Sequence, residues 1–378
     1  MKFRYLFYLL CFLLLPVFLP AAEFYLDVYD YYLNLPATWS VYSAETEDYL
    51  VFQDQHEKAF FQVQTLHRTT GDTSPAAVCR ETLAGLQPRI ETAVFSYNGN
   101  RACYGTVGFS MGEATAEGFT VCIELEDTFV LLFAYTAEQN LTSYMPLLLS
   151  CLDGFSYTRG GRKLPGPVSQ FYYPFPGEQE KQFRIRFQSG EIPVFVDPGE
   201  VDASQDMIER EARILAELPE LNIDAWERYY QLIYRDSYMR IEPAARKIGR
   251  MLTEKDDYTK ASELLTWLQG FSYLRTGTVS DLQSPLQTLL TATGDCDSLG
   301  LLYCIILDYL GIESILLVSN EYAHSIVGVD VPGEGARFQY EETSYLVAEL
   351  TDQVEIGLID RTMADPGKWI PISLQSGN

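Results

Sequence analysis

The sequence predicts an α+β protein of two domains, and three observations lead to this prediction. The chain has 378 residues, a length that suits two domains better than one. Residues 159–170, "RGGRKLPGPVSQ", have the glycine, proline and basic content of a linker. Residues 23–158 are rich in alternating, strand-like runs, whereas residues 171–378 pass from helices through a strongly apolar helix to short strands.

Residues 1–22 have the features of an export signal. Lys2 and Arg4 precede an apolar run that ends in two alanines. Two prolines interrupt this run, which argues against a regular membrane helix. We therefore expect export to the periplasm or cell envelope, with membrane attachment through an uncleaved leader as the alternative.

The N-terminal domain, residues 23–158, is expected to be an α/β sandwich with an antiparallel sheet. "AFFQVQTL" alternates as a strand does, and Asn98-Gly99 is a typical hairpin turn between two further strands. Ser74 and Pro75 open a predicted helix, "SPAAVCRETLAGL". A second helix, "LTSYMPLLLSCLDGF", closes the domain.

The opening "LNLPATW", the antiparallel strands and the closing helix resemble PsbP-like domains. The resemblance covers most of residues 23–158. It implies a binding or scaffolding module without catalysis.

Composition limits the partners of the protein. The formal net charge is −25, and no stripe of lysine and arginine offsets it, so the surface repels phosphate backbones and nucleic-acid binding is not expected. An exported chain can form disulfides, and four N-terminal cysteines allow three pairings. Cys103 with Cys122 is the favoured pair because both fall in consecutive strands, and buried free thiols are the alternative. The four are Cys79, Cys103, Cys122 and Cys151.

The C-terminal domain, residues 171–378, begins with strand-like "KQFRIRFQSGEIPVFV" and continues through three helical segments. In the last of these, Leu264, Leu268 and Phe271 form one apolar face. Five short runs after Gly311 predict an antiparallel sheet, namely "SILLVS", "AHSIVGVDV", "ARFQYE", "SYLVAEL" and "VEIGLI".

Between the helices and these strands stands "TGDCDSLGLLYCIILDYLG". The segment is apolar nearly all round and ends at Gly311, so it predicts a central buried helix. Cys296 falls in its first turn, where the positive end of the helix dipole stabilises a thiolate. Asp295 and Asp297 oppose thiolate formation, so a nearby imidazolium would be needed. Cys304, in the middle of the apolar run, is expected to be a core residue.

His324 is the candidate base because it begins an alternating strand that could pack on the cysteine helix. Glu349 lies on a later strand and could orient the imidazole, completing a nucleophile triad of thiol, base and acid. His56 and His67 belong to the other domain and are interpreted as ordinary surface residues.

Residues 255–355, with "TGDCDSLGLLYCIILDYLG", "AHSIVGVD" and "YLVAELT", resemble the transglutaminase-like superfamily of papain-type cysteine enzymes. The resemblance places the nucleophile on Cys296, the histidine on His324 and the third acid on Glu349, with Asp352 as the alternative acid. Two departures are a glutamate where the usual acid is aspartate, and Ser325-Ile326 where an aromatic residue often follows the histidine. The implied domain has a central cysteine helix packed on an antiparallel sheet, and the implied chemistry is acyl transfer through a thioester.

The predicted function is therefore that of an exported thiol enzyme acting on peptide or protein amide bonds, with no cofactor. Gln269 or Tyr273 could supply an oxyanion donor or support the site. No histidine and cysteine spacing fits a zinc site, so no metal is expected. The alternative is a catalytically inactive envelope protein that binds or scaffolds partners.

Overall fold

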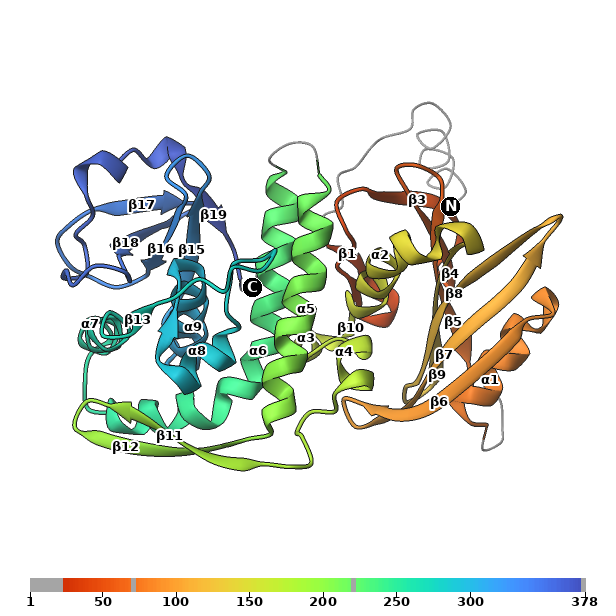
Figure 1. Ribbon diagram of the computed structural model, residues 1–378, viewed down its shortest axis with the longest axis horizontal. Helices are drawn as coiled ribbons and strands as arrows, with labels where there is room; N and C mark the ends of the chain where they lie inside the picture. Colours follow the sequence, from red (N-terminus) through yellow and green to blue (C-terminus); the bar gives the residue numbers. More distant parts are fainter. Residues whose placement is uncertain (1–22, 69–72, 219–221, 375–378) are drawn as a thin grey trace, which may run out of the picture.

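The computed structural model describes residues 23–68, 73–218 and 222–374, and it confirms the predicted α+β class with antiparallel sheets. Figure 1 shows the N-terminal sheet on one side, the C-terminal helices and sheet on the other, and the helices α5 (Pro198–Ala216) and α6 (Ile223–Met251) between them. The predicted export signal, residues 1–22, lies outside the described residues. Within those residues, none of the helices has both the length and the apolar character needed to cross a bilayer.

A seven-stranded antiparallel sheet forms the centre of the N-terminal domain. Its spatial order is β3-β4-β5-β9-β8-β7-β6. The strands are β3 (Trp39–Thr46), β4 (Tyr49–Asp54), β5 (Ala59–His67), β6 (Arg89–Tyr97), β7 (Asn100–Met111), β8 (Ala114–Glu124) and β9 (Thr128–Ala137). The turn between β6 and β7 is the predicted one, with Asn98 and Gly99 at φ 49° and 82°, the left-handed values that a two-residue hairpin turn requires.

Two helices cover opposite faces of this sheet. The helix α1 (Pro75–Leu83) is capped by Ser74, whose side chain accepts from the Ala77 N–H at 3.2 Å, as the sequence predicts. The helix α2 (Leu141–Asp153) packs on the other face through Leu148 and Leu152. A small sheet of β1 (Phe24–Leu26), β2 (Tyr31–Leu33) and β10 (Phe155–Tyr157) lies beside α2 in the same apolar cluster.

Residues 159–170, predicted to be a linker, are folded onto the N-terminal domain. They contribute to two short helices, α3 (Thr158–Gly161) and α4 (Pro167–Tyr172). The Gln170 amide donates to Asn98 Oδ1 at 2.6 Å, and the Ser169 hydroxyl donates to Asp153 at 2.6 Å. The glycine- and proline-rich segment between the domains is therefore packed against the N-terminal domain.

The C-terminal domain begins with an antiparallel hairpin and continues with five helices and a five-stranded antiparallel sheet, of order β17-β18-β16-β15-β19. Its remaining elements are β11 (Lys181–Phe187), β12 (Gly190–Val196), α7 (Asp257–Leu268), β13 (Ser272–Tyr273), α8 (Pro285–Thr291), β14 (Thr293–Gly294), α9 (Cys296–Tyr309), β15 (Ser314–Ser319), β16 (His324–Val329), β17 (Arg337–Tyr340), β18 (Thr343–Ala348) and β19 (Ile370–Ile372).

The apolar helix α9 lies at the centre of this domain, packed between α6, α7, α8 and the strands β15 and β16. It is buried along its length and ends as predicted, with Gly311 in the left-handed region at φ 74°. A helix with apolar side chains on every face can be stable in water only when neighbours cover it on every face.

One predicted strand is wrong. Residues 354–359, "VEIGLI", form no strand, and β19 occupies the sheet edge beside β15 instead. Gly357 has φ 92°, and a Cβ there would lie 2.6 Å from the Glu334 carbonyl oxygen. Two backbone segments approach closely at this glycine. An alternating apolar pattern does not reveal such an approach.

Buried ion pairs join the two domains. Arg228 of α6 contacts Glu211 of α5 at 2.8 Å and donates to the Ser150 hydroxyl of α2 at 2.7 Å. Arg210 pairs with Asp153 at 2.6 Å. Because these charges are buried, removing one partner would leave the other buried without a counter-charge. The contacts therefore fix how the domains meet.

Candidate functional site

The site is built around the first turn of α9, where local hydrogen bonds hold Cys296. Asp295 caps the helix, its Oδ1 accepting from the Ser298 N–H at 2.9 Å and from the Ser298 hydroxyl at 2.5 Å. The Ser298 hydroxyl in turn accepts from the Gln283 N–H at 3.0 Å. Cys296 is 3% exposed, so its thiol lies at a fixed, nearly buried position at the positive end of the helix.

His324 is the first residue of β16, and its ring lies between the thiol and a carboxylate. Its Nε2 is 2.8 Å from Glu349 Oε2, and the Cys296 side chain is within hydrogen-bonding reach of the ring. With Nε2 engaged by the acid, Nδ1 is the ring nitrogen available to the sulfur. The structure therefore brings together three residues that are far apart in the sequence.

Glu349 follows β18 and is anchored on both oxygens. Its Oε1 accepts from the Thr351 N–H at 2.8 Å and the Thr351 hydroxyl at 2.7 Å, which leaves Oε2 for His324. Asp352, the alternative acid in the sequence, is exposed. The carboxylate that orients the imidazole is thus itself oriented by a second layer of hydrogen bonds.

Charge interactions favour a protonated imidazole. Burial works against the charged ring, but its interactions with Cys296 and Glu349 outweigh burial and raise the pKa of His324 from 6.5 to about 10. Burial also acts to raise the pKa of Glu349, yet the hydrogen bond and charge of His324 and the donors of Thr351 lower it overall. The pair consequently exists as imidazolium and carboxylate at neutral pH.

The sequence prediction named Gln269 and Tyr273 as oxyanion donors or supporting residues, and the two have different surroundings in the structure. The Gln269 amide donates to the carbonyls of Glu349 at 2.8 Å and Val354 at 2.9 Å, so it holds the segment that carries the acid. Tyr273 pairs in register with Gly294, two residues before the cysteine, and its hydroxyl accepts from Arg275 Nε at 3.1 Å. Gln269 is therefore a support, while Tyr273 lies beside the thiol.

Trp369 belongs to the site, although sequence reasoning missed it. Its ring packs against His324 at 63° with a centroid separation of 6.3 Å, and its indole N–H donates to the Met363 carbonyl at 2.9 Å. The tryptophan is 6% exposed, so it covers the imidazole from the side of the sheet. It lies far beyond His324 in the sequence, and no local signal connects the two residues.

Two carboxylates flank the thiol. Atoms of Asp295, Cys296 and Asp297 that could bind a cation lie within 4.8 Å of one another. Burial, with the neighbouring Asp297 charge, raises the pKa of Asp295 to about 6. Burial also raises the pKa of Asp297, against the opposing effect of the Ser325 and Tyr230 hydroxyls. Asp295 is already bound by Ser298, and His324 by Glu349, so we assign no metal to this group.

A pocket of about 350 Å³ opens beside the site, between the end of α5, the start of α6 and the first turn of α9. Asp297 lines it, which connects the pocket directly to the residue that follows the thiol.

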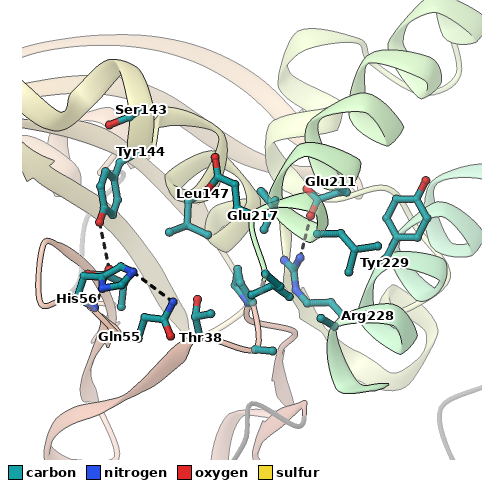
Figure 2. Close-up of a pocket in the computed structure, with 17 residues that line it drawn as sticks. Thr38, Gln55, His56, Ser143, Tyr144, Leu147, Glu211, Glu217, Arg228 and Tyr229 are labelled. Carbon is teal, nitrogen blue, oxygen red and sulfur yellow. Dashed lines mark hydrogen bonds and ion pairs between the residues drawn. The ribbon is translucent and has the colours of Figure 1, made fainter. Parts of the chain in front are cut away.

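A second pocket, of about 260 Å³, lies between the two domains. Figure 2 shows His56 and Tyr144 of the N-terminal domain facing Glu211 and Arg228 of α5 and α6 across this pocket. The polar groups on its walls already bind one another, since Arg228 pairs with Glu211 and the Tyr144 hydroxyl reaches Asp54 at 3.4 Å. The described residues around this pocket include none of Cys296, Asp297 and His324, so it is separate from the candidate site.

The other cysteines and histidines singled out in the sequence lie elsewhere. Cys103 and Cys122 are direct cross-strand neighbours on β7 and β8, yet every cysteine of the described residues is a free, buried thiol. Cys304 is buried in the middle of α9. His56 and His67 are exposed in the N-terminal domain, away from Cys296.

No family model matches the chain, and no curated protein matches it significantly. Among solved structures, it is similar to the PsbP protein CyanoP of Synechocystis sp. PCC 6803, with 12% identity, coverage of 36% of this chain and 91% of that one, and a TM-score of 0.30. LpqN, involved in cell envelope biogenesis in Mycobacterium tuberculosis, has 13% identity over 34% of this chain and 83% of its own, with a TM-score of 0.23. A candidate protease from Parabacteroides distasonis ATCC 8503 has 11% identity, covers 74% of this chain and 62% of its own, and has a TM-score of 0.21. Likenesses at this level assign no function to the chain.

Proposed function

We propose that this protein is an exported thiol enzyme of transglutaminase-like fold that acts on amide bonds of peptides or proteins. The observation that carries the proposal is the chain of contacts from Cys296 through His324 to Glu349, with the imidazole between a thiol and a buried carboxylate. A thiol at a helix start, a base within reach and an acid behind the base are the parts that nucleophilic catalysis requires.

The proposed reaction begins with the Cys296 thiolate and the His324 imidazolium as an ion pair. The sulfur attacks the amide carbonyl, and a carbon–sulfur bond forms. As the tetrahedral intermediate collapses, the carbon–nitrogen bond breaks, and His324 gives its proton to the departing amine. The neutral imidazole then takes a proton from water, or from a second amine, which attacks the thioester and releases the sulfur as thiolate.

The first turn of α9 can stabilise the oxyanion. Cys296 and Asp297 are the first residues of the helix, so their N–H groups have no acceptor within it. These donors point along the same axis as the helix dipole, which favours negative charge at this end. The Tyr273 hydroxyl, on the strand paired with Gly294, is a further candidate donor.

Thiol reactivity tests the proposal without knowledge of the substrate. We expect iodoacetamide at neutral pH to label Cys296 at least about tenfold faster than free cysteine, because the imidazolium holds the sulfur as thiolate. His324→Asn should abolish this advantage, while His67→Asn, an exposed histidine of the other domain, should leave it unchanged. Labelling no faster than free cysteine, or equally fast without His324, would contradict the proposal.

One observation favours a second function, that of a binding or scaffolding protein in the envelope. The two carboxylates flanking Cys296 disfavour a negative charge on the sulfur. If they outweigh the imidazolium, the thiol stays protonated, and the slow labelling described above is the result that would support this alternative.

A further inference from the structure

We propose that the pocket beside Cys296 binds a cationic side chain of the substrate peptide, an ammonium or guanidinium group close to the carbonyl that is attacked. The inference rests on the proposed function, because it assigns a role to the pocket as part of that site. We call it the Asp297 pocket. Its principal walls are Trp226, Tyr229, Tyr230, Ser280, Asp297 and Asn320.

The position of the pocket suits substrate recognition. Its volume is about 350 Å³, enough for a long side chain, and it opens to solvent between α5 and α6. The carboxylate of Asp297 lies within 4.8 Å of the Cys296 sulfur. Asn320 lies at the end of β15, in the turn that leads to His324. Cys296 is not itself among the lining residues, but the pocket adjoins the nucleophile through Asp297, so a group held there would belong to a chain that lies close to the sulfur.

The charge of the Asp297 pocket favours a cationic ligand. Among the described residues that line the pocket, Asp297 is the single acidic one, and no lysine or arginine lines it. The nearby Arg275 is already held by Asp281 at 3.2 Å and by the Tyr273 hydroxyl. Burial raises the pKa of Asp297, although the charges of His324 and Arg275 act to lower it, so a bound cation would further stabilise this buried carboxylate.

The aromatic walls reinforce this selection. Trp226 and Tyr230 lie 5.9 Å apart between ring centroids at 38°, and Tyr229 lies 5.1 Å from Tyr230 at 69°. All three come from the first eight residues of α6, so one helix presents them together. Aromatic faces attract ammonium and guanidinium groups, most strongly where water is partly excluded. A carboxylate with aromatic walls is complementary to a cationic side chain and repels an anionic one.

Charged thiol reagents test this inference on the intact protein. We would measure the rates at which Cys296 reacts with three methanethiosulfonates, one carrying a trimethylammonium group, one a sulfonate and one neutral. The decisive quantity is the ratio of the cationic to the anionic rate, because the intrinsic reactivity of the sulfur cancels from it. We expect this ratio to exceed that of free cysteine by at least about tenfold, since a charge within about 4 Å of a partly buried carboxylate interacts strongly.

Matched variants locate the effect. Asp297→Asn should lower the ratio about tenfold. Asp330→Asn, which removes an equal charge at the opposite, exposed end of β16, should leave it unchanged and so controls for the net charge of the protein. Trp226→Leu keeps every charge and should lower the ratio by roughly two- to fivefold, as expected for loss of a cation–π contact. This third variant keeps the test decisive if Asp297→Asn fails to fold.

The outcomes separate this inference from the proposed function. A neutral reagent that reacts no faster than with free cysteine would overturn the proposed function itself. Fast reaction of the neutral reagent, combined with a ratio that neither Asp297→Asn nor Trp226→Leu changes, would leave the thiol enzyme in place and overturn the cationic pocket.

Discussion

The helix α9 carries two cysteines that differ in environment far more than in burial. Cys296 is 3% exposed and Cys304 1%. Cys304 lies two turns into the helix among apolar side chains, and burial there raises the pKa of its thiol to about 12. Cys296 lies where the helix begins, within reach of an imidazolium. Under the proposed function, the helix terminus and the charged neighbour make Cys296 the reactive thiol, and burial alone does not distinguish the two cysteines.

The largest expected effect is the contrast in reactivity between these two cysteines. In the native protein at pH 7, we expect iodoacetamide to label Cys296 at least about 1000-fold faster than Cys304, because a thiol with a pKa near 12 is almost never ionised at that pH. Peptide mapping by mass spectrometry measures the two rates. Cys304→Ser should keep the labelling rate of the wild type, and Cys296→Ser should leave the folded protein nearly unlabelled. In denaturant the two cysteines should react equally, and a difference that persists there would contradict a structural origin.

A smaller effect is expected from removal of the acid behind the imidazole. Glu349→Gln keeps the shape of the side chain but removes the charge that stabilises the imidazolium, so the pKa of His324 should fall. We expect the labelling rate of Cys296 at neutral pH to drop roughly 100-fold, with the pH profile shifted to match. The control is Asp352→Asn, which removes the exposed acid three residues later and should change neither quantity. Equal effects of the two variants would refute the assigned role of Glu349.

The third expected effect, which is the smallest when taken per pH unit, is on the pH dependence of stability. The pKa of His324 is raised from 6.5 to about 10 in the folded protein, so the stabilisation from its charge is fully present below pH 6.5. It should be lost as the pH rises from 6.5 to about 10, with a slope of up to about 1.4 kcal/mol per pH unit. Urea unfolding across this range measures the slope. His324→Asn should flatten it, and an unchanged slope in that variant would show that another group is responsible.

Much of the site can be predicted from the sequence because its chemistry depends on local position. The capping Asp295, the apolar run and Gly311 mark the start and end of α9, so Cys296 could be placed in a first turn without coordinates. The predicted Ser74 cap and Asn98-Gly99 turn are likewise local features, and both occur in the structure. These features depend on residues that are neighbours in the sequence, and the predictions made for them are confirmed.

Other features depend on contacts between distant segments, and local patterns do not contain them. The linker composition of residues 159–170 gave no sign that they would dock through Gln170. The alternating run 354–359 resembles a strand, yet it forms none, and a Cβ at Gly357 would lie 2.6 Å from the Glu334 carbonyl oxygen. Trp369 packs against His324, and Gln269 holds the segment that carries Glu349. Both contacts join residues that are far apart in the sequence.

By itself, the sequence determined the class of the fold, the central apolar helix and the thiol at its start, because helix caps, periodicity and buried length are properties of consecutive residues. Only the tertiary structure decided that Glu349 and not Asp352 binds His324, that Gln269 supports the acid, and that a pocket with a single carboxylate opens beside the sulfur. The physical reason is that these are distances between side chains on different elements, and such distances exist only once the elements pack.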